Sequence, residues 1–167
     1  MNVLALDPSL SSTGYAIINS DTKEIIRKGR FVTTNKDDTD SRIQKIICFL
    51  EQFDILVNTV ILEDGFIGKG VKSSMDICQL RGALIAFYKY RGYTVKHQEP
   101  TLIRKNFGLK GNAKKEEVAQ EVLKYYPNLE SEIGVYSDKT NKNKTSDIYD
   151  AIATGLSYIL NIKEEQC

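Results

Sequence analysis

The sequence is poor in the residues that build disulfide scaffolds and zinc sites. Its 167 residues contain three scattered cysteines, Cys48, Cys78 and Cys167, and a single histidine, His97. An odd number of isolated cysteines argues against a disulfide framework, and one histidine leaves too few ligands for a zinc site. We therefore expect the cysteines to be ordinary core or surface thiols.

The chain also lacks a long apolar segment and a large charge imbalance. No stretch reaches the roughly 18 apolar residues of a membrane span. No basic start is followed by an apolar run, so we expect neither a signal peptide nor a membrane helix. This predicts a soluble, cytoplasmic protein. The net charge of +1 gives no overall attraction to nucleic acid, so such a partner would need a local basic patch.

The apolar pattern predicts one α/β domain spanning residues 1–167. Alternating or continuous apolar runs between turn residues predict five strands, at 2–7, 13–19, 24–32, 57–62 and 94–97. Apolar spacing of three and four predicts helices, at 42–53, 73–90, 114–125 and 146–160, the last capped by Ser146, with a helical turn opened by Pro100. Three antiparallel meander strands, followed by two strands parallel to the first, form a mixed five-stranded sheet flanked by helices.

Two acids stand where apolar strands end. Asp7 follows the first strand and Glu63 follows the fourth. If these strands are neighbours and parallel, both carboxylates lie at the carboxyl edge of the sheet, where open α/β sheets usually bind ligands. Either acid alone is compatible with a structural role, but two carboxylates in one place raise a pKa or attract a cation.

The closing helix carries a second pair of acids. Asp147 and Asp150 are three residues apart, so they are neighbours on one helix face beside its apolar stripe. Asp147 could instead complement the positive end of the helix dipole. Four carboxylates without a cysteine or histidine partner suit Mg²⁺ or Mn²⁺. Two such ions about 3.5–4 Å apart support in-line displacement at phosphorus, so the set predicts phosphodiester hydrolysis.

Five segments, spread over nearly the whole chain, carry a family resemblance. They are LALDPSLSSTGYAII, VILEDGF, SSMDICQLRGALIAF, EPTLIRKNFGLKGNAKKEEV and SDIYDAIATGLSYI. In this order they resemble the RuvC family of Holliday junction resolvases, within the RNase H-like and retroviral-integrase superfamily. The resemblance implies an RNase H-like fold and a Mg²⁺-dependent endonuclease, acting as a homodimer on four-way junctions and other branched DNA and leaving 5′-phosphate ends.

The resemblance also implies roles for individual residues. The family's acidic tetrad falls on Asp7, Glu63, Asp147 and Asp150, with Asp7 as the ligand shared by two Mg²⁺ ions that Mn²⁺ may replace. The family's catalytic lysine falls on Lys115. The helix that carries Gln79, Arg81 and Gly82 resembles the family's dimerisation helix, although Gly82 would equally allow close packing on the sheet.

Basic residues beside these acids form the predicted DNA contacts. The resemblance implies an aromatic residue three positions after the glutamate that stacks on bases at the crossover, and this position is Phe66. Lys69 and Lys72 follow it in the sequence. The segment from 104 to 115 has five basic residues and no acid; besides Lys115 they are Arg104, Lys105, Lys110 and Lys114. A second cluster, Lys139, Lys142 and Lys144, precedes the acid-bearing helix and is either a phosphate contact or an ordinary solvated surface.

Other functions remain open at this stage. A member of the same superfamily could process ribosomal RNA precursors, and an actin-like nucleotide-binding module would use the first acid-containing turn for phosphate, although the chain is short for two lobes. The loop EDGFIGKGVKSS resembles the diverged phage and poxvirus branch of the family, which implies broad action on branched DNA. A phage-encoded member would act in the cytoplasm of the bacterial host. His97 could assist the site, but a structural role is the simpler interpretation for it and for Glu99.

Overall fold

A computed structural model describes residues 1–64, 70–139 and 144–164, with the side chains of Ile55, Lys163 and Glu164 left aside. The sheet is built from β1 (Asn2–Asp7), β2 (Ser12–Asn19), β3 (Ile25–Val32), β4 (Thr59–Glu63) and β5 (Thr94–Gln98). The helices are α1 (Thr39–Glu51), a 3₁₀ turn (Asp54–Leu56), α2 (Val71–Tyr90), α3 (Pro100–Asn106), α4 (Lys115–Tyr125), α5 (Leu129–Ile133) and α6 (Ser146–Glu164).

The five strands form one mixed sheet in the order β3-β2-β1-β4-β5. Strands β1, β2 and β3 pair antiparallel, whereas β4 is parallel to both β1 and β5. The predicted mixed sheet is therefore confirmed. Its central strands are buried on both faces, because each face is covered by helices.

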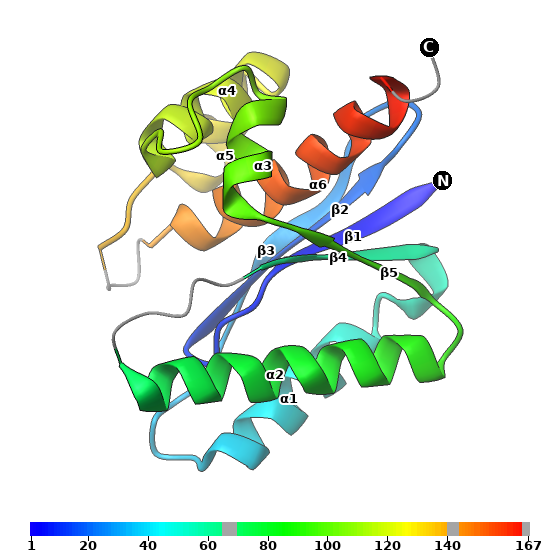
Figure 1. Cartoon of the computed structure of the whole chain (residues 1–167), viewed down its shortest axis with the longest axis vertical. Coiled ribbons are helices and arrows are strands. Elements are labelled where there is room, and N and C mark those ends of the chain that lie inside the picture. Colours follow the sequence, from blue (N-terminus) through cyan, green and yellow to red (C-terminus); the bar gives the residue numbers. More distant parts are fainter. Residues whose placement is uncertain (65–69, 140–143, 165–167) are drawn as a thin grey trace.

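Figure 1 shows α1 and α2 below one face of the sheet and α3, α4, α5 and α6 above the other. Each layer has its own apolar core. Leu4, Leu6 and Leu62 pack against α1 and α2, whereas Val3 and Ile61 face α6 and its neighbours. Among the described residues, no helix is long and apolar enough to cross a membrane.

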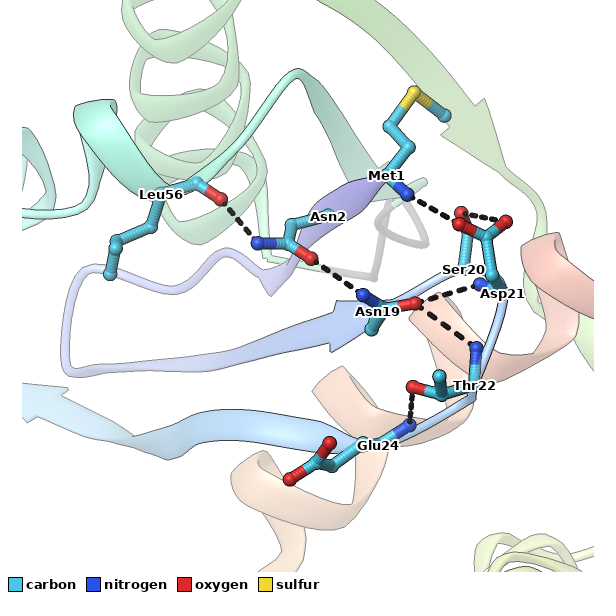
Figure 2. Close-up of polar contacts among 8 residues, drawn as sticks. All are labelled: Met1, Asn2, Asn19, Ser20, Asp21, Thr22, Glu24 and Leu56. Carbon is cyan, nitrogen blue, oxygen red and sulfur yellow. Dashed lines mark hydrogen bonds and ion pairs between the residues drawn. The ribbon is translucent and has the colours of Figure 1, made fainter.

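Polar contacts fix the end of β1 that lies away from Asp7 (Figure 2). The Asn2 amide donates to the carbonyl of Leu56 at 2.8 Å and accepts from Asn19 at 3.2 Å. The terminal amine forms a 2.7 Å ion pair with Asp21. These contacts link β1 to the turn after β2 and to the segment before β4, so they support the register that places Asp7.

Several sequence-based boundaries differ from the structure. Helix α1 begins at Thr39 because Asp38 caps it through the amide of Ser41, and α2 begins two residues before the predicted start. Helix α5 was not predicted, since a five-residue helix has too short an apolar period to detect. The prediction that Ser146 caps α6 is wrong: Ser146 is the first helical residue, and its buried hydroxyl has no hydrogen-bond partner among the described residues.

Candidate active site

The parallel pairing of β1 and β4 brings the first two acids together. Leu6 lies opposite Leu62 in this register, so Asp7 and Glu63 are the next residues at the carboxyl ends of adjacent strands. The pairing confirms the condition on which their predicted proximity depended. The sheet edge therefore carries two carboxylates on a rigid, fully hydrogen-bonded support.

Helix α6 adds the second pair of acids and buries them more deeply than predicted. Asp147 and Asp150 are only 5% and 7% exposed, rather than lying at the margin of the buried face. Thr154, one turn further on, is fully buried and donates to Glu63 Oε2 at 3.2 Å and to the carbonyl of Asp150 at 2.9 Å. This hydroxyl connects the acid on β4 to the acid-bearing helix.

Gly14 allows α6 to approach the sheet at this point. It lies opposite Asp7 on β2. A Cβ atom placed on Gly14 would lie 1.9 Å from the carbonyl oxygen of Asp147. Only glycine leaves room for the first turn of α6 here, so Gly14 positions Asp147, a role that our sequence analysis did not assign. The sequence feature that indicates this role is a glycine inside an otherwise apolar strand.

The four acids create a strongly unfavourable environment for negative charge. Burial, followed by the charges of Glu63 and Asp150, raises the pKa of Asp7 well above its usual range. Burial together with Asp150 raises the pKa of Glu63 from 4.5 to about 7. Burial also raises the pKa of Asp150, although Lys115 partly offsets the effect. A site with this property favours protonation or the binding of a cation.

Two lysines form ion pairs with acids of the site. Lys115, the first residue of α4, forms an ion pair with Asp150. Burial would lower the pKa of Lys115, but Asp150, Asp7 and Glu63 outweigh it and raise the pKa above its ordinary value. Lys144 forms a 2.7 Å ion pair with Asp147 Oδ1, whereas the buried Oδ2 of the same carboxylate has no hydrogen-bond partner in the described part of the chain.

These residues suit a divalent metal by their chemistry, although their side chains do not yet converge as a ligand set. Within residues 1–64, 70–139 and 144–164, no three His, Cys, Asp or Glu side chains are close enough together to hold an ion. The donors are all carboxylates, as Mg²⁺ prefers. The unpartnered Oδ2 of Asp147 and the raised pKa values are both relieved when a cation binds. The residues therefore fit a hard divalent cation.

A groove of about 740 Å³ opens over the carboxyl edge of the sheet. It is lined by Asp7, Pro8, Ser9, Glu63, Asp64, Ile77, Glu99, Pro100, Thr101, Arg104, Gly111, Asn112 and Lys115. Three of the five residues predicted to be catalytic lie in it, and Asp150 lines the adjoining pocket with Glu63 and Lys115. The groove thus passes over Asp7, Glu63 and Lys115, whereas Asp147 lines neither the groove nor the adjoining pocket.

The predicted DNA-binding residues fall into three groups. Lys72, Lys105, Lys110 and Lys114 are exposed, as a phosphate contact requires. Arg104 is half-buried and donates to the carbonyls of Pro100 and Ala113, both at 2.7 Å, so it braces the turn before Lys115. Phe66 and Lys69 lie outside the described residues, as does Lys142.

A second polar cluster lies beside Glu63, on the edge formed by α2 and β5. Asp64 forms an ion pair with Arg81, and its Oδ1 also lies 3.1 Å from His97 Nδ1. The backbone amide of Asp64 donates to the carbonyl of Gln98 at 2.9 Å. The contact of His97 with Asp64 agrees with a structural role for His97. The ion pair of Arg81 with Asp64 is an intramolecular contact that the helical pattern did not reveal.

The fold and the acidic edge define an RNase H-like nuclease. A model of the family described as crossover junction endodeoxyribonuclease RuvC matches residues 3–158. The RuvC proteins of Ehrlichia chaffeensis and Helicobacter pylori are 31% and 32% identical to this chain, each over 168 residues that cover 98% of this chain and 99% of the relative. The chain belongs to the RuvC family, whose nucleases depend on a divalent metal.

Solved structures show the same fold. RuvC of Thermus thermophilus in complex with a Holliday junction substrate has a TM-score of 0.74 at 17% identity, covering 98% of this chain and 96% of the other. The fowlpox virus resolvase in complex with Holliday junction DNA has a TM-score of 0.60 at 20% identity, covering 97% and 99%. These findings do not favour the RNA-processing or actin-like alternatives.

Substitution of Glu63 tests, without DNA, whether the folded protein raises the pKa of this carboxyl group. Because the pKa of Glu63 is raised in the folded protein to about 7, its contribution to stability is present below pH 4.5 and is lost as the pH rises through 7. We expect Glu63→Gln to raise the free energy of unfolding of the metal-free protein by about 1–3 kcal/mol at pH 8 and by much less at pH 5. Urea unfolding in EDTA measures both values.

The control for this experiment is Glu99→Gln, which removes an exposed acid from the same groove. The free energy of unfolding of Glu99→Gln should differ from that of the wild type by nearly the same amount at pH 5 and at pH 8. Adding Mg²⁺ at pH 8 should stabilise the wild type more than Glu63→Gln. If the free energy of unfolding depended on pH equally in the wild type, Glu63→Gln and Glu99→Gln, the proposed environment of Glu63 would be contradicted.

Proposed function

We propose that this chain is a structure-selective endonuclease that resolves Holliday junctions and related branched DNA, with Mg²⁺ held by Asp7, Glu63, Asp147 and Asp150. One observation carries the assignment of the site. The parallel pairing of β1 and β4 places Asp7 beside Glu63 on the sheet edge against which α6 buries two further acids. These four carboxylates would hold two Mg²⁺ ions, or Mn²⁺ in their place. The chemistry that the ions would supply is activation of water and stabilisation of charge on a leaving 3′ oxygen, so cleavage would leave 5′-phosphate ends.

The side chains around the groove position the substrate. Lys115 approaches the acids from the first turn of α4, and the Arg104 contacts brace the turn that precedes it. Its ammonium group is therefore placed to neutralise the phosphate that lies over the carboxylates. The exposed Lys105, Lys110 and Lys114 extend the positive charge along the same segment. Phe66 is proposed to stack on bases at the crossover, and Lys69 to contact the DNA beside it.

A direct assay tests this function against its rivals. Cleavage is compared on a four-way DNA junction, a replication fork, a linear DNA duplex and an RNA duplex, each with Mg²⁺, with Mn²⁺ and with EDTA. We expect metal-dependent cutting of the junction and the fork and little cutting of the two linear duplexes. Equal cutting of linear DNA would refute structure selectivity, and preferred cutting of RNA would favour the RNA-processing alternative.

We further propose that the enzyme acts as a homodimer through α2. The residues of α2 that face away from the sheet form an apolar or small stripe, Val71, Met75, Cys78, Gly82 and Ala86. Val71 and Met75 are 76% and 57% exposed, and a Cβ on Gly82 would meet no atom within 4 Å. A second copy of the same helix would cover this stripe, and two sites related by a twofold axis match the two equivalent strands of a four-way junction.

A charge on the stripe should weaken this dimer. Met75→Lys is expected to raise the dimer dissociation constant by about tenfold or more, which corresponds to about 1.4 kcal/mol. Sedimentation velocity over a concentration series measures the change. Tyr90→Lys is the matched control, because Tyr90 is 95% exposed on the same helix but lies outside the stripe. An unchanged dimer in Met75→Lys would place the interface elsewhere.

A further inference from the structure

Lys144 lies between the acidic site and a second groove. Its ammonium group is 2.7 Å from Asp147 Oδ1, and the two side chains are only 24% and 7% exposed. Lys144 also lines a groove of about 450 Å³ together with Arg30, Ser137 and Thr145. This second groove shares none of its lining residues with the groove over the sheet edge. Lys144 therefore borders both a predicted metal ligand and a separate groove, whose lining contains Arg30 and none of the four acids.

The ion pair only partly satisfies Asp147. A buried carboxylate needs a cation or hydrogen-bond donors for both oxygens. Lys144 contacts Oδ1, whereas Oδ2 is buried and unpartnered among the described residues. A divalent ion bound to Asp147 provides what the lysine does not, and two cations on one carboxylate repel each other. Binding of a metal at Asp147 is therefore expected to displace Lys144.

The backbone beside Lys144 is held in place. The amide of Thr145 donates to the carbonyl of Ser137 at 3.1 Å, and the Thr145 hydroxyl donates to the carbonyl of Val135 at 2.7 Å. The lysine side chain, by contrast, is a flexible four-carbon stem with a rotatable ammonium group. The lysine side chain can therefore change partner by rotation about its own bonds while Thr145 keeps its hydrogen bonds.

We propose that Lys144 exchanges partners, neutralising Asp147 when no divalent cation is bound and turning to a DNA phosphate in the second groove once Asp147 ligates the metal. The inference rests on the proposed function, since it takes Asp147 to be a metal ligand. It implies that metal and DNA strengthen each other's binding through this residue, and by linkage the effect is reciprocal. It also decides between the two interpretations of the basic cluster before α6, in favour of a phosphate contact for Lys144.

The test compares Lys144→Gln with the wild type in two measurements. Calorimetry with Ca²⁺, a hard ion that prefers oxygen ligands, gives the affinity for the metal without DNA. Binding of a four-way junction, measured over a range of salt concentrations in EDTA and in Ca²⁺, gives the number of phosphate contacts. Lys139→Gln is the matched control, because Lys139 is exposed in the same loop. Lys144→Arg retains the positive charge.

We expect Lys144→Gln to bind Ca²⁺ about 3- to 10-fold more tightly than the wild type, because a competing cation has been removed. Its log–log salt slope for junction binding should become shallower by about 0.9 in Ca²⁺ and remain unchanged in EDTA. Lys144→Arg should keep the wild-type slope in both conditions. Lys139→Gln should leave the Ca²⁺ affinity unchanged and alter the slope equally in EDTA and Ca²⁺, if at all.

Two results would overturn the inference. The first is an unchanged Ca²⁺ affinity in Lys144→Gln, and the second is an equal loss of slope with and without Ca²⁺. Asp147→Asn separates these failures from a failure of the proposed site. If Asp147→Asn binds Ca²⁺ as well as the wild type, Asp147 is not a ligand and the proposed function loses that assignment. If Asp147→Asn binds weakly while Lys144→Gln is normal, only the exchange is refuted.

Discussion

Asp7→Asn should cut a four-way junction at least about 1,000-fold more slowly than the wild type, because a lost metal ligand removes several kcal/mol of charge stabilisation at the phosphate. Junction binding should stay within a few-fold of the wild type, since DNA affinity depends mainly on phosphate contacts made by basic residues. Single-turnover cleavage and an electrophoretic binding assay measure the two quantities separately.

Loss of activity in this variant should not be caused by unfolding. Burial and the neighbouring acids raise the pKa of Asp7, so the folded protein favours a neutral group at this position. Asp7→Asn is therefore expected to be at least as stable as the wild type in EDTA at pH 8. Glu24→Gln is the control, since Glu24 is an exposed acid in the turn between β2 and β3, at the end of the sheet opposite to Asp7. Cleavage by Asp7→Asn at the wild-type rate would refute the site assignment.

Gly14→Ala should lower cleavage by about 100-fold, the cost expected for misplacing a catalytic group by about 1 Å. The added Cβ would lie 1.9 Å from the carbonyl oxygen of Asp147 and 2.6 Å from its carbonyl carbon. These are backbone atoms of α6 and cannot rotate away, so the first turn of the helix must shift. The same overpacking should destabilise the fold by about 1–3 kcal/mol.

The effect of Gly14→Ala is distinguished from a general effect of adding a methyl group by Gly111→Ala. A Cβ on Gly111 would make only ordinary contacts, at 3.9 Å from Lys105 and Thr101. This variant should retain cleavage within about threefold of the wild type, or about 0.7 kcal/mol. Wild-type cleavage by Gly14→Ala would show that the position of Asp147 tolerates movement.

The expected effects of Asp7→Asn and Glu63→Gln have one cause, the crowding of buried carboxylates at the site. Carboxylates are held together at a cost to the metal-free fold, because burial and mutual repulsion oppose their ionisation. A substitution that removes one of these charges is therefore expected to stabilise the protein while removing its activity, a common trade-off at functional sites. Lys115 and Lys144 reduce this cost in the absence of metal.

The sequence alone predicted the five strands, most of the helices and the acids of the proposed site. The runs that end in Asp7 and Glu63, and the three-residue spacing of Asp147 and Asp150, are local features that predict strands, a helix and oxygen ligands for a hard metal. The five segments predicted the family, which the matched relatives confirm. Local periodicity is enough for these features because each depends on neighbours along the chain.

Only the tertiary structure decided which groups meet. Glu63 is 56 residues from Asp7 in the chain, and their proximity depends on the parallel pairing of β1 with β4, a long-range contact that local patterns do not specify. The approach of α6 that requires Gly14 and the Thr154 bond to Glu63 both arise when α6 packs on the sheet. Burial sets their pKa values and contacts, and burial exists only in the folded chain.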